Sequence, residues 1–208
     1  MMLLLLACGP DPAVIATGIG SDNPAVRQDM VVAGKLVDDP VVVEALVAAL
    51  EDESTIIRIT ALESLADLDA VDAVPAICLR LEDDDDAVQR AAVDALGRLQ
   101  DPAATPALVD YLDRNRAGRV PLNALWALGN IGDPEALPIL SRFREHEDPY
   151  VAYNADQALR TIGDAEFVAD AEPDPVELEE PEEAPVEEAP KAPAEEPSEN
   201  KKNVAFPG

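Results

Sequence analysis

One segment of this chain recurs at nearly constant spacing. The residues ALGRLQDP at 95–102 return as ALGNIGDP at 127–134, and leucines in the same register stand at 65, 96, 128 and 159, with spacings of 31, 32 and 31 residues. Periods of about 20 to 50 residues are the sequence signature of repeat proteins, whose units stack on their neighbours. The period therefore predicts a row of similar units in place of a single globular core.

Each unit reads as a helical hairpin. Apolar residues at 88, 92, 95, 96 and 99 follow the three- and four-residue steps of one face of an α-helix. A shorter apolar run at 106–112 follows Asp101-Pro102, a pair typical of a turn and a helix N-cap. A hairpin of about thirty residues cannot bury its own apolar faces, so neighbouring hairpins must cover them.

The fold class predicted from these patterns is all-α, an α-solenoid of about four and a half hairpins. We predict first helices at 24–36, 54–68, 86–99, 118–131 and 149–162, and second helices at 40–50, 71–81, 102–112 and 134–143. A signal or anchor with a linker occupies 1–20 and the solenoid 21–168, closed by Phe167 and Val168. The acidic tail at 169–208, rich in Pro, Glu and Ala, is expected to be disordered.

The repeat pattern resembles the short HEAT repeats first associated with phycobilisome bilin lyases. The motif D-x-x-x-V-R, then A-L-G-x-[LI]-x-D-P, is carried by Asp22 to Arg27, Ala95 to Leu108 and Ala127 to Leu140, and the resemblance covers residues 21–166. It implies a solenoid of HEAT-like hairpins. For function it implies a scaffold or adaptor, or alternatively a chromophore-handling enzyme of the bilin lyase or isomerase kind.

Composition argues against several classes of function. A formal net charge of −28 opposes a role in binding nucleic acids, which requires a footprint of Lys and Arg. His146 is the only histidine, so neither a zinc site nor a His-dependent catalytic triad is expected. The acidic run Glu82 to Asp86 lacks the spacing of a calcium loop and suits a helix N-terminus. We therefore expect no metal, no cofactor and no enzymatic activity.

The N-terminus carries a second resemblance. Leu5-Leu6-Ala7-Cys8 is similar to the lipobox of bacterial lipoproteins, in which the cysteine is acylated, although no Lys or Arg precedes it and its apolar run is short. The resemblance implies lipidation of Cys8 and a lipid-anchored place in the bacterial cell envelope, with the cytoplasm as the alternative. Cys78 then has no disulfide partner and is expected to be a buried small side chain.

Arginines are candidates for two roles, pairing between units and binding of a partner. Arg27 and Arg58 occupy the same position in successive units and are expected to pair with acidic turn residues of the neighbouring unit, for which Asp38, Asp39, Asp69 and Asp72 are available. The candidate partner-binding site combines the following arginines and tyrosines, a composition common at binding hot spots: Arg114, Arg116, Arg119, Tyr150 and Tyr153. Trp126, within an apolar stripe, is expected to lie in the core.

These observations predict a monomeric, non-catalytic scaffold or adaptor that binds another protein or peptide and touches a membrane only through a lipid anchor. The arginine cluster is expected to receive an acidic partner or the acidic tail of the chain itself. A structural spacer is a further alternative, and the terminal KKNVAFPG is a candidate binding motif.

Overall fold

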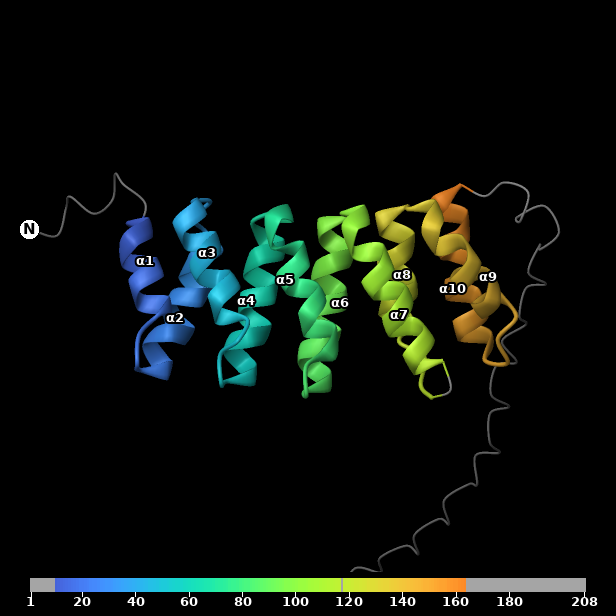
Figure 1. Cartoon of the computed structure of the whole chain (residues 1–208), viewed down its shortest axis with the longest axis horizontal. Helices are drawn as coiled ribbons and strands as arrows, with labels where there is room; N and C mark the ends of the chain where they lie inside the picture. The colour runs from blue at the N-terminus through green and yellow to red at the C-terminus, as the bar shows by residue number, and fades with distance from the viewer. Residues whose placement is uncertain (1–9, 117, 164–208) are drawn as a thin grey trace, which may run out of the picture. The chain divides into compact units, whose positions relative to one another are not determined.

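The computed structural model describes residues 10–116 and 118–163, which lie in one compact unit, Met1–Ala171. In these residues the chain is helical, and the helices follow one another in chain order along a row (Figure 1). Cys8, Phe167, Val168 and the tail at 169–208 lie outside the described residues. The predicted all-α solenoid is confirmed.

Two layers of helices make up the row. The first helices pack against one another in sequence; they are α2 (Pro24–Gly34), α4 (Thr55–Asp67), α6 (Asp86–Leu99), α8 (Leu122–Ile131) and α10 (Pro149–Ile162). The second layer contains α1 (Pro12–Ile19), α3 (Pro40–Ala49), α5 (Val74–Leu79), α7 (Thr105–Asn115) and α9 (Leu137–Arg144). Helix α1, which the sequence analysis had left in a linker, packs on α2 and α3 and buries Ile15 and Ile19.

The second helices of the central units begin with a tight turn. Short 3-10 segments precede or follow the α-helices: η1 (Val71–Ala73), η2 (Arg80–Glu82), η3 (Pro102–Ala104) and η4 (Pro134–Ala136). Asp101 and Asp133 cap η3 and η4, each accepting from the backbone N–H two residues later, as the Asp-Pro pairs predicted. Proline suits these starts because its missing N–H has no intrahelical partner there.

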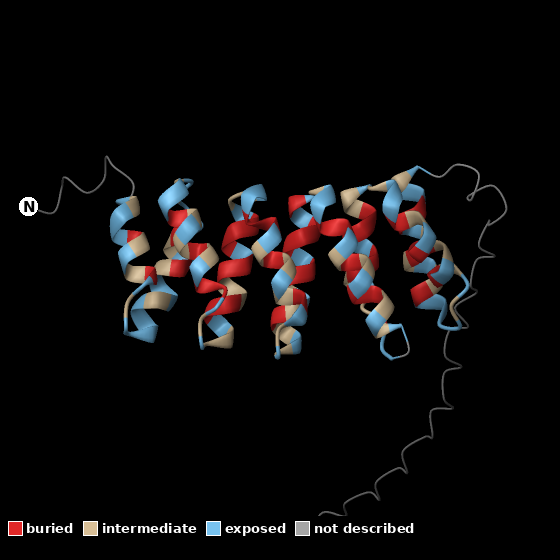
Figure 2. Ribbon diagram, in the orientation of Figure 1, coloured by how far each residue is buried: buried red, intermediate tan, exposed pale blue. Residues whose placement is uncertain are grey.

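The core is a continuous stripe between the layers (Figure 2). The register leucines Leu65, Leu96, Leu128 and Leu159 are fully buried. Gly97 lets α8 approach α6 closely, since a Cβ there would lie 2.8 Å from the Cβ of Ala127. Each unit thus covers an apolar face of the next unit. For this reason the repeat spacing predicted the fold.

Helix α8 differs from the prediction at its start. It begins at Leu122 and not at residue 118, so the turn that would match the first turn of α6 is absent. Pro121 precedes the helix and carries no side-chain oxygen, and no side-chain cap hydrogen bond is formed there. The α7–α8 connection, 116–121, is consequently longer than the connection 83–85 that precedes α6.

Candidate functional site

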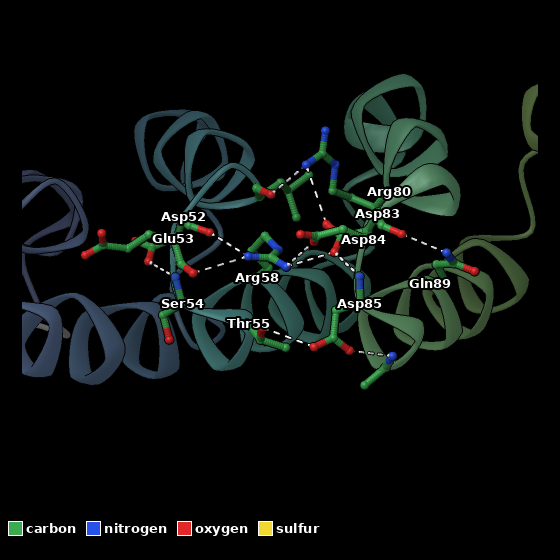
Figure 3. Close-up of polar contacts among 12 residues, drawn as sticks. Asp52, Glu53, Ser54, Thr55, Arg58, Arg80, Asp83, Asp84, Asp85 and Gln89 are labelled. Atoms are coloured by element: carbon green, nitrogen blue, oxygen red, sulfur yellow. Dashed lines mark hydrogen bonds and ion pairs between the residues drawn. The ribbon is translucent and has the colours of Figure 1, made fainter.

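Arginines of the first helices join successive units. Nε of Arg27 lies 2.6 Å from Oδ2 of Asp52, and Nη2 of Arg58 lies 2.8 Å from Oδ1 of Asp83. Arg58 also donates to the main-chain oxygen of Asp52, at 2.9 Å, so one guanidinium holds the loop of its own unit to that of the next (Figure 3). We call the ion pairs Arg27–Asp52 and Arg58–Asp83 the arginine ladder.

The inter-unit pairing of these arginines is as expected, but the acids differ. Asp38, Asp39, Asp69 and Asp72 are not the partners; the acids are in the loops that precede α4 and α6, one helix further along the chain. Burial alone would raise the pKa of Asp83, yet hydrogen bonds from Arg58 and from the N–H of Asp85 hold it below its usual range. The acidic run at 82–86 therefore serves the ladder and the cap of α6.

The ladder stops after its second step. In the repeat register, Gln89 and Pro121 take the place of the arginines, and Asn115 and His146 take the place of the aspartates. Nδ1 of His146 accepts from the N–H of Asp148 at 3.1 Å, just as Oδ1 of Asp83 accepts from the N–H of Asp85 at 3.0 Å. The loop geometry at His146 is thus preserved while the ion pair is missing.

A hollow of about 870 Å³ occupies the region where the ladder is missing. All four replacing residues line it: Gln89, Asn115, Pro121 and His146. The start of α8, the start of α10 and the side of α7 complete its wall. Because the hollow coincides with a break in an otherwise regular pattern, we take it as the candidate functional site.

The charged side chains that line the hollow are two arginines, Arg90 and Arg119, and two aspartates, Asp86 and Asp148. Among the described residues, the side chains of Arg90 and Arg119 form no ion pair, and both line the hollow. The side chain of Tyr111 is enclosed, with 6% of the residue exposed. Burial, followed by the charge of Asp86, raises the pKa of Tyr111. The phenol therefore stays protonated and remains a donor at neutral pH.

The predicted arginine and tyrosine site is only partly assembled. Arg119 and Tyr150 line the hollow, whereas Arg114 pairs with Glu82 at 2.6 Å and Arg116 with Asp113 at 2.9 Å. Tyr153 is exposed on α10, outside the lining. The sequence analysis missed the contribution of Arg90, Tyr111 and His146, although the loss of arginine from the register at Gln89 was a usable signal.

Trp126 is not in the core, contrary to expectation. It is 46% exposed, and its ring lies over Gly97, where a Cβ would come within 2.8 Å of Cζ3. Leu122, one turn earlier on α8, is also exposed, and Tyr153 holds the same register position on α10. We call Leu122, Trp126 and Tyr153 the first-helix aromatic face.

Two searches of the described part of the chain gave negative results. Within residues 10–116 and 118–163, no group of three or more His, Cys, Asp or Glu side chains is arranged to hold a metal ion. Over the same residues, no helix has the length and apolar character needed to cross a bilayer.

Stacked two-helix units with a shared core define an α-solenoid repeat protein. The chain belongs to the HEAT-repeat family, whose model matches residues 43–121 and 114–172. It is similar to a chain in the complex of CpcE and CpcF of phycocyanin lyase from Nostoc sp. PCC7120, with 30% identity, a TM-score of 0.63, and coverage of 76% of this chain and 67% of that one.

Engineered repeat proteins share the fold at lower identity. A designed armadillo repeat protein in complex with the peptide (KR)4 is 21% identical, with a TM-score of 0.55 over 71% of this chain and 80% of that chain. An engineered protein is 22% identical, with the same TM-score over 73% of this chain and 78% of its own. No curated protein is significantly similar to this chain in sequence.

The likeness to the lyase corrects one prediction. The sequence analysis expected no enzymatic activity, and the 30% identity to a phycocyanin lyase chain contradicts that expectation. The physical reason is that the expectation rested on local motifs. On a solenoid, a site is assembled from side chains of several helices, as the hollow between α6, α7, α8 and α10 shows, and no short motif marks it.

Proposed function

We propose that this chain is a protein-binding HEAT-repeat subunit that holds a partner protein against the first-helix aromatic face. The observation that carries the proposal is the exposure of Trp126 on α8, beside Leu122 and in line with Tyr153. Exposed tryptophan and tyrosine are typical of the residues that dominate binding energy at protein interfaces. A single exposed apolar side chain is ordinary, but Leu122 and Trp126 lie one turn apart on α8, and Tyr153 on α10 has the register of Leu122, so the three form a candidate contact surface.

Contacts that hold α8 to α6 support the proposal. Trp126 is braced by Gly97, and Asn123 ties α8 to α6 by donating to Oδ1 of Asp94 at 2.9 Å. A preorganised surface loses little conformational freedom on binding, which favours affinity. The similarity to a chain solved within a two-protein complex also favours a partner protein.

Site-specific photo-crosslinking tests the proposal in cells. A photoreactive amino acid at Tyr153 is expected to capture one recurrent protein, and the same group at Leu79, exposed on α5 in the second layer, serves as the matched control. Trp126→Ala, made in the protein that carries the photoreactive group at position 153, is expected to weaken capture at least tenfold. Truncation of a hot-spot side chain lowers the binding free energy by about 2 kcal/mol or more. Equal capture from both positions, or capture indifferent to Trp126→Ala, contradicts this assignment.

A second candidate function is a lyase-type activity that handles a bilin chromophore. The 30% identity to a chain of a phycocyanin lyase complex supports it. The experiment is to mix the purified chain with a bilin and record the absorption spectrum, because a bound tetrapyrrole changes its colour. A spectrum identical to that of free bilin at a protein excess removes this candidate.

We further propose that acylation of Cys8 tethers the chain to a membrane of the bacterial cell envelope. The support is the lipobox-like Leu5-Leu6-Ala7-Cys8. Cys8→Ser is expected to move the protein from the membrane fraction to the supernatant, since lipid chains supply the affinity. Cys78→Ser is the matched control, and an unchanged distribution of the Cys8→Ser protein argues for an untethered protein.

A further inference from the structure

We propose that a groove between α4 and α6 binds a basic amphipathic helix of the partner protein. The groove has a volume of about 560 Å³ and lies between two neighbouring helices of the first layer. Helix α6 also packs on α8, which carries Leu122 and Trp126 of the first-helix aromatic face. The inference rests on the proposed function and deepens it, because it names the chemistry of the partner.

The floor of the groove is apolar. It is lined by four aliphatic side chains of α4 and α6: Ile59, Ala87, Ala91 and Ala95. In the next repeat the ring of Trp126 lies over Gly97, whereas the residue in its register on α6 is Asp94, a smaller side chain. The space between α4 and α6 is therefore open where its counterpart between α6 and α8 is covered in part by an indole ring.

Carboxylates stand on both walls of the groove. Glu63 of α4 and Asp94 of α6 share one register position, and both residues are exposed. Neither forms an ion pair within the described residues, although Asp94 accepts from the side-chain amide of Asn123 at 2.9 Å. A third acid of the groove, Asp67, is paired with Arg98. Two carboxylates without a cationic partner favour a positively charged group between them.

The apolar floor indicates what kind of cation suits the groove. Lysine and arginine side chains lay their aliphatic stems along apolar surface while the charged head stays with polar groups. Such a side chain covers Ile59 and Ala91 and brings its charge to Glu63 and Asp94. The net charge of −28 also attracts positively charged proteins to this chain over longer distances.

One arginine of the groove has the opposite effect on a bound cation. Arg90 lies four residues before Asp94, about 6 Å along α6. Its charge opposes a cation in the groove but faces two carboxylates. Removal of Arg90 should therefore strengthen the binding of a cation and weaken the binding of an anion.

The length of the groove fits a helix. Its lining residues run from 59 to 67 on α4 and from 87 to 98 on α6, and the longer run spans about 16 Å. An α-helix rises about 5.4 Å per turn, so a helix in the groove presents about three turns. Helices that bind in grooves place apolar side chains at three- and four-residue spacing against the floor. The expected partner segment has such an apolar face bordered by lysine or arginine.

Peptide binding to the full-length chain tests the inference. The probe is a fluorescein-labelled peptide of leucine and lysine, spaced so that an α-helix places the leucines on one face. Its binding is followed by fluorescence anisotropy at low ionic strength. Two control peptides, one with glutamate in place of lysine and one with the same composition in scrambled order, are each expected to bind about tenfold more weakly or worse.

Four variants locate the contact. Glu63→Gln and Asp94→Asn are each expected to weaken binding about threefold, as for exposed ion pairs, and Asp94→Asn keeps an acceptor for Asn123. Arg90→Gln is expected to strengthen binding by about the same factor. Glu44→Gln removes an exposed acid from α3 in the second layer. It is the matched control for net charge and is expected to leave binding unchanged.

Four results overturn the inference. Failure of the leucine–lysine peptide to bind the unmodified chain rules out the site, and equal binding of the scrambled peptide rules out a helix as the occupant. Glu63→Gln and Asp94→Asn proteins that bind like the Glu44→Gln control place the contact outside the groove. Weaker binding to Arg90→Gln contradicts a bound cation. The assay uses no natural partner, so its failure is distinct from a failure of photo-crosslinking at position 153, which bears on the proposed function.

Discussion

Nη2 of Arg58 lies 2.8 Å from Oδ1 of Asp83, and this pair fixes the loop before α6 against the second HEAT unit. Both side chains are nearly enclosed, at 10% and 4% exposure. A pair in this setting contributes little as an ion pair but is costly to break, since the remaining charge is left buried. The pair holds the loop before α6 to helix α4 of the preceding repeat.

The first prediction concerns the loss of the Arg58–Asp83 pair. Arg58→Ala is expected to lower the free energy of unfolding by about 3 kcal/mol, the low end of the range for a broken buried pair. Arg80 keeps the loss small because its Nη1 stays 3.8 Å from Oδ2 of Asp83. Urea unfolding measures the change. Arg98→Ala breaks an exposed pair and is expected to cost under about 1 kcal/mol; equal costs for the two variants contradict this interpretation.

Acidification should reveal the same pair. The pKa of Asp83 in the folded chain is below its ordinary value of about 3.9, so the stability it adds is present above that value and is lost as pH falls through the folded pKa. Asp83→Asn removes this titration and retains an acceptor for the N–H of Asp85. The difference in unfolding free energy between wild type and Asp83→Asn is expected to be constant above about pH 5 and to shrink below about pH 4.

The unfolding free energy of wild type has to be compared with that of Asp83→Asn at each pH, because the whole chain is strongly acidic. Protonation of its many carboxylates relieves repulsion at low pH and raises the stability of wild type and variant together. Urea titrations at several pH values give the difference directly. A gap that stays constant down to pH 2 contradicts a lowered pKa.

Close packing at Gly97 gives a third prediction. Gly97→Ala places a Cβ 2.8 Å from Cζ3 of Trp126 and 2.9 Å from Cα of Ala127, and this main-chain atom cannot step aside alone. Overpacking is expected to outweigh the better helix propensity of alanine and to destabilise the chain by about 1 to 2 kcal/mol. Trp126 is the only tryptophan, so its emission should shift as α8 moves.

Gly118→Ala is the control for that experiment. No atom lies within 4 Å of a Cβ built at Gly118, so its melting temperature and tryptophan emission should match those of wild type. A Gly97→Ala protein as stable as the control would show that α6 and α8 separate without cost.

A buried hydroxyl gives the fourth prediction. Oγ1 of Thr105 has no hydrogen-bond partner among the described residues, although the residue is 1% exposed. Thr105→Val keeps the shape and removes the unpaired group, so the free energy of unfolding is expected to rise by about 1 kcal/mol. Thr60→Val, which deletes a hydroxyl that donates to the oxygen of Ile56 at 2.8 Å, should bring no such gain. Thermal or urea unfolding compares the two, and an equal response contradicts the assignment.

Most of the fold could be predicted from the sequence, because the same local patterns recur in successive repeats. The register leucines and the Asp-Pro caps at 101 and 133 recur at one spacing, and each is a local matter of helix face or helix start. The exception among the first helices is α8, where Pro121 moved the start to Leu122. Helix α1 was missed because it lies before the first recognisable repeat.

The site depended on tertiary structure. Arg27 and Arg58 were recognised from their register, but their partners Asp52 and Asp83 lie 25 residues further on, at a distance set by how one unit packs on the next. Trp126 was assigned to the core because periodicity shows which stripe a residue joins and not whether the neighbouring helix covers it.

The sequence by itself determined the helical units, their order and the position at which the arginine register breaks. Only the tertiary structure decided that Arg90, Tyr111 and Arg119 meet in one hollow while Arg114 and Arg116 are taken up by acids. The physical reason is that helix formation and capping act over one or two turns, whereas contacts between units depend on side-chain packing across about thirty residues of chain.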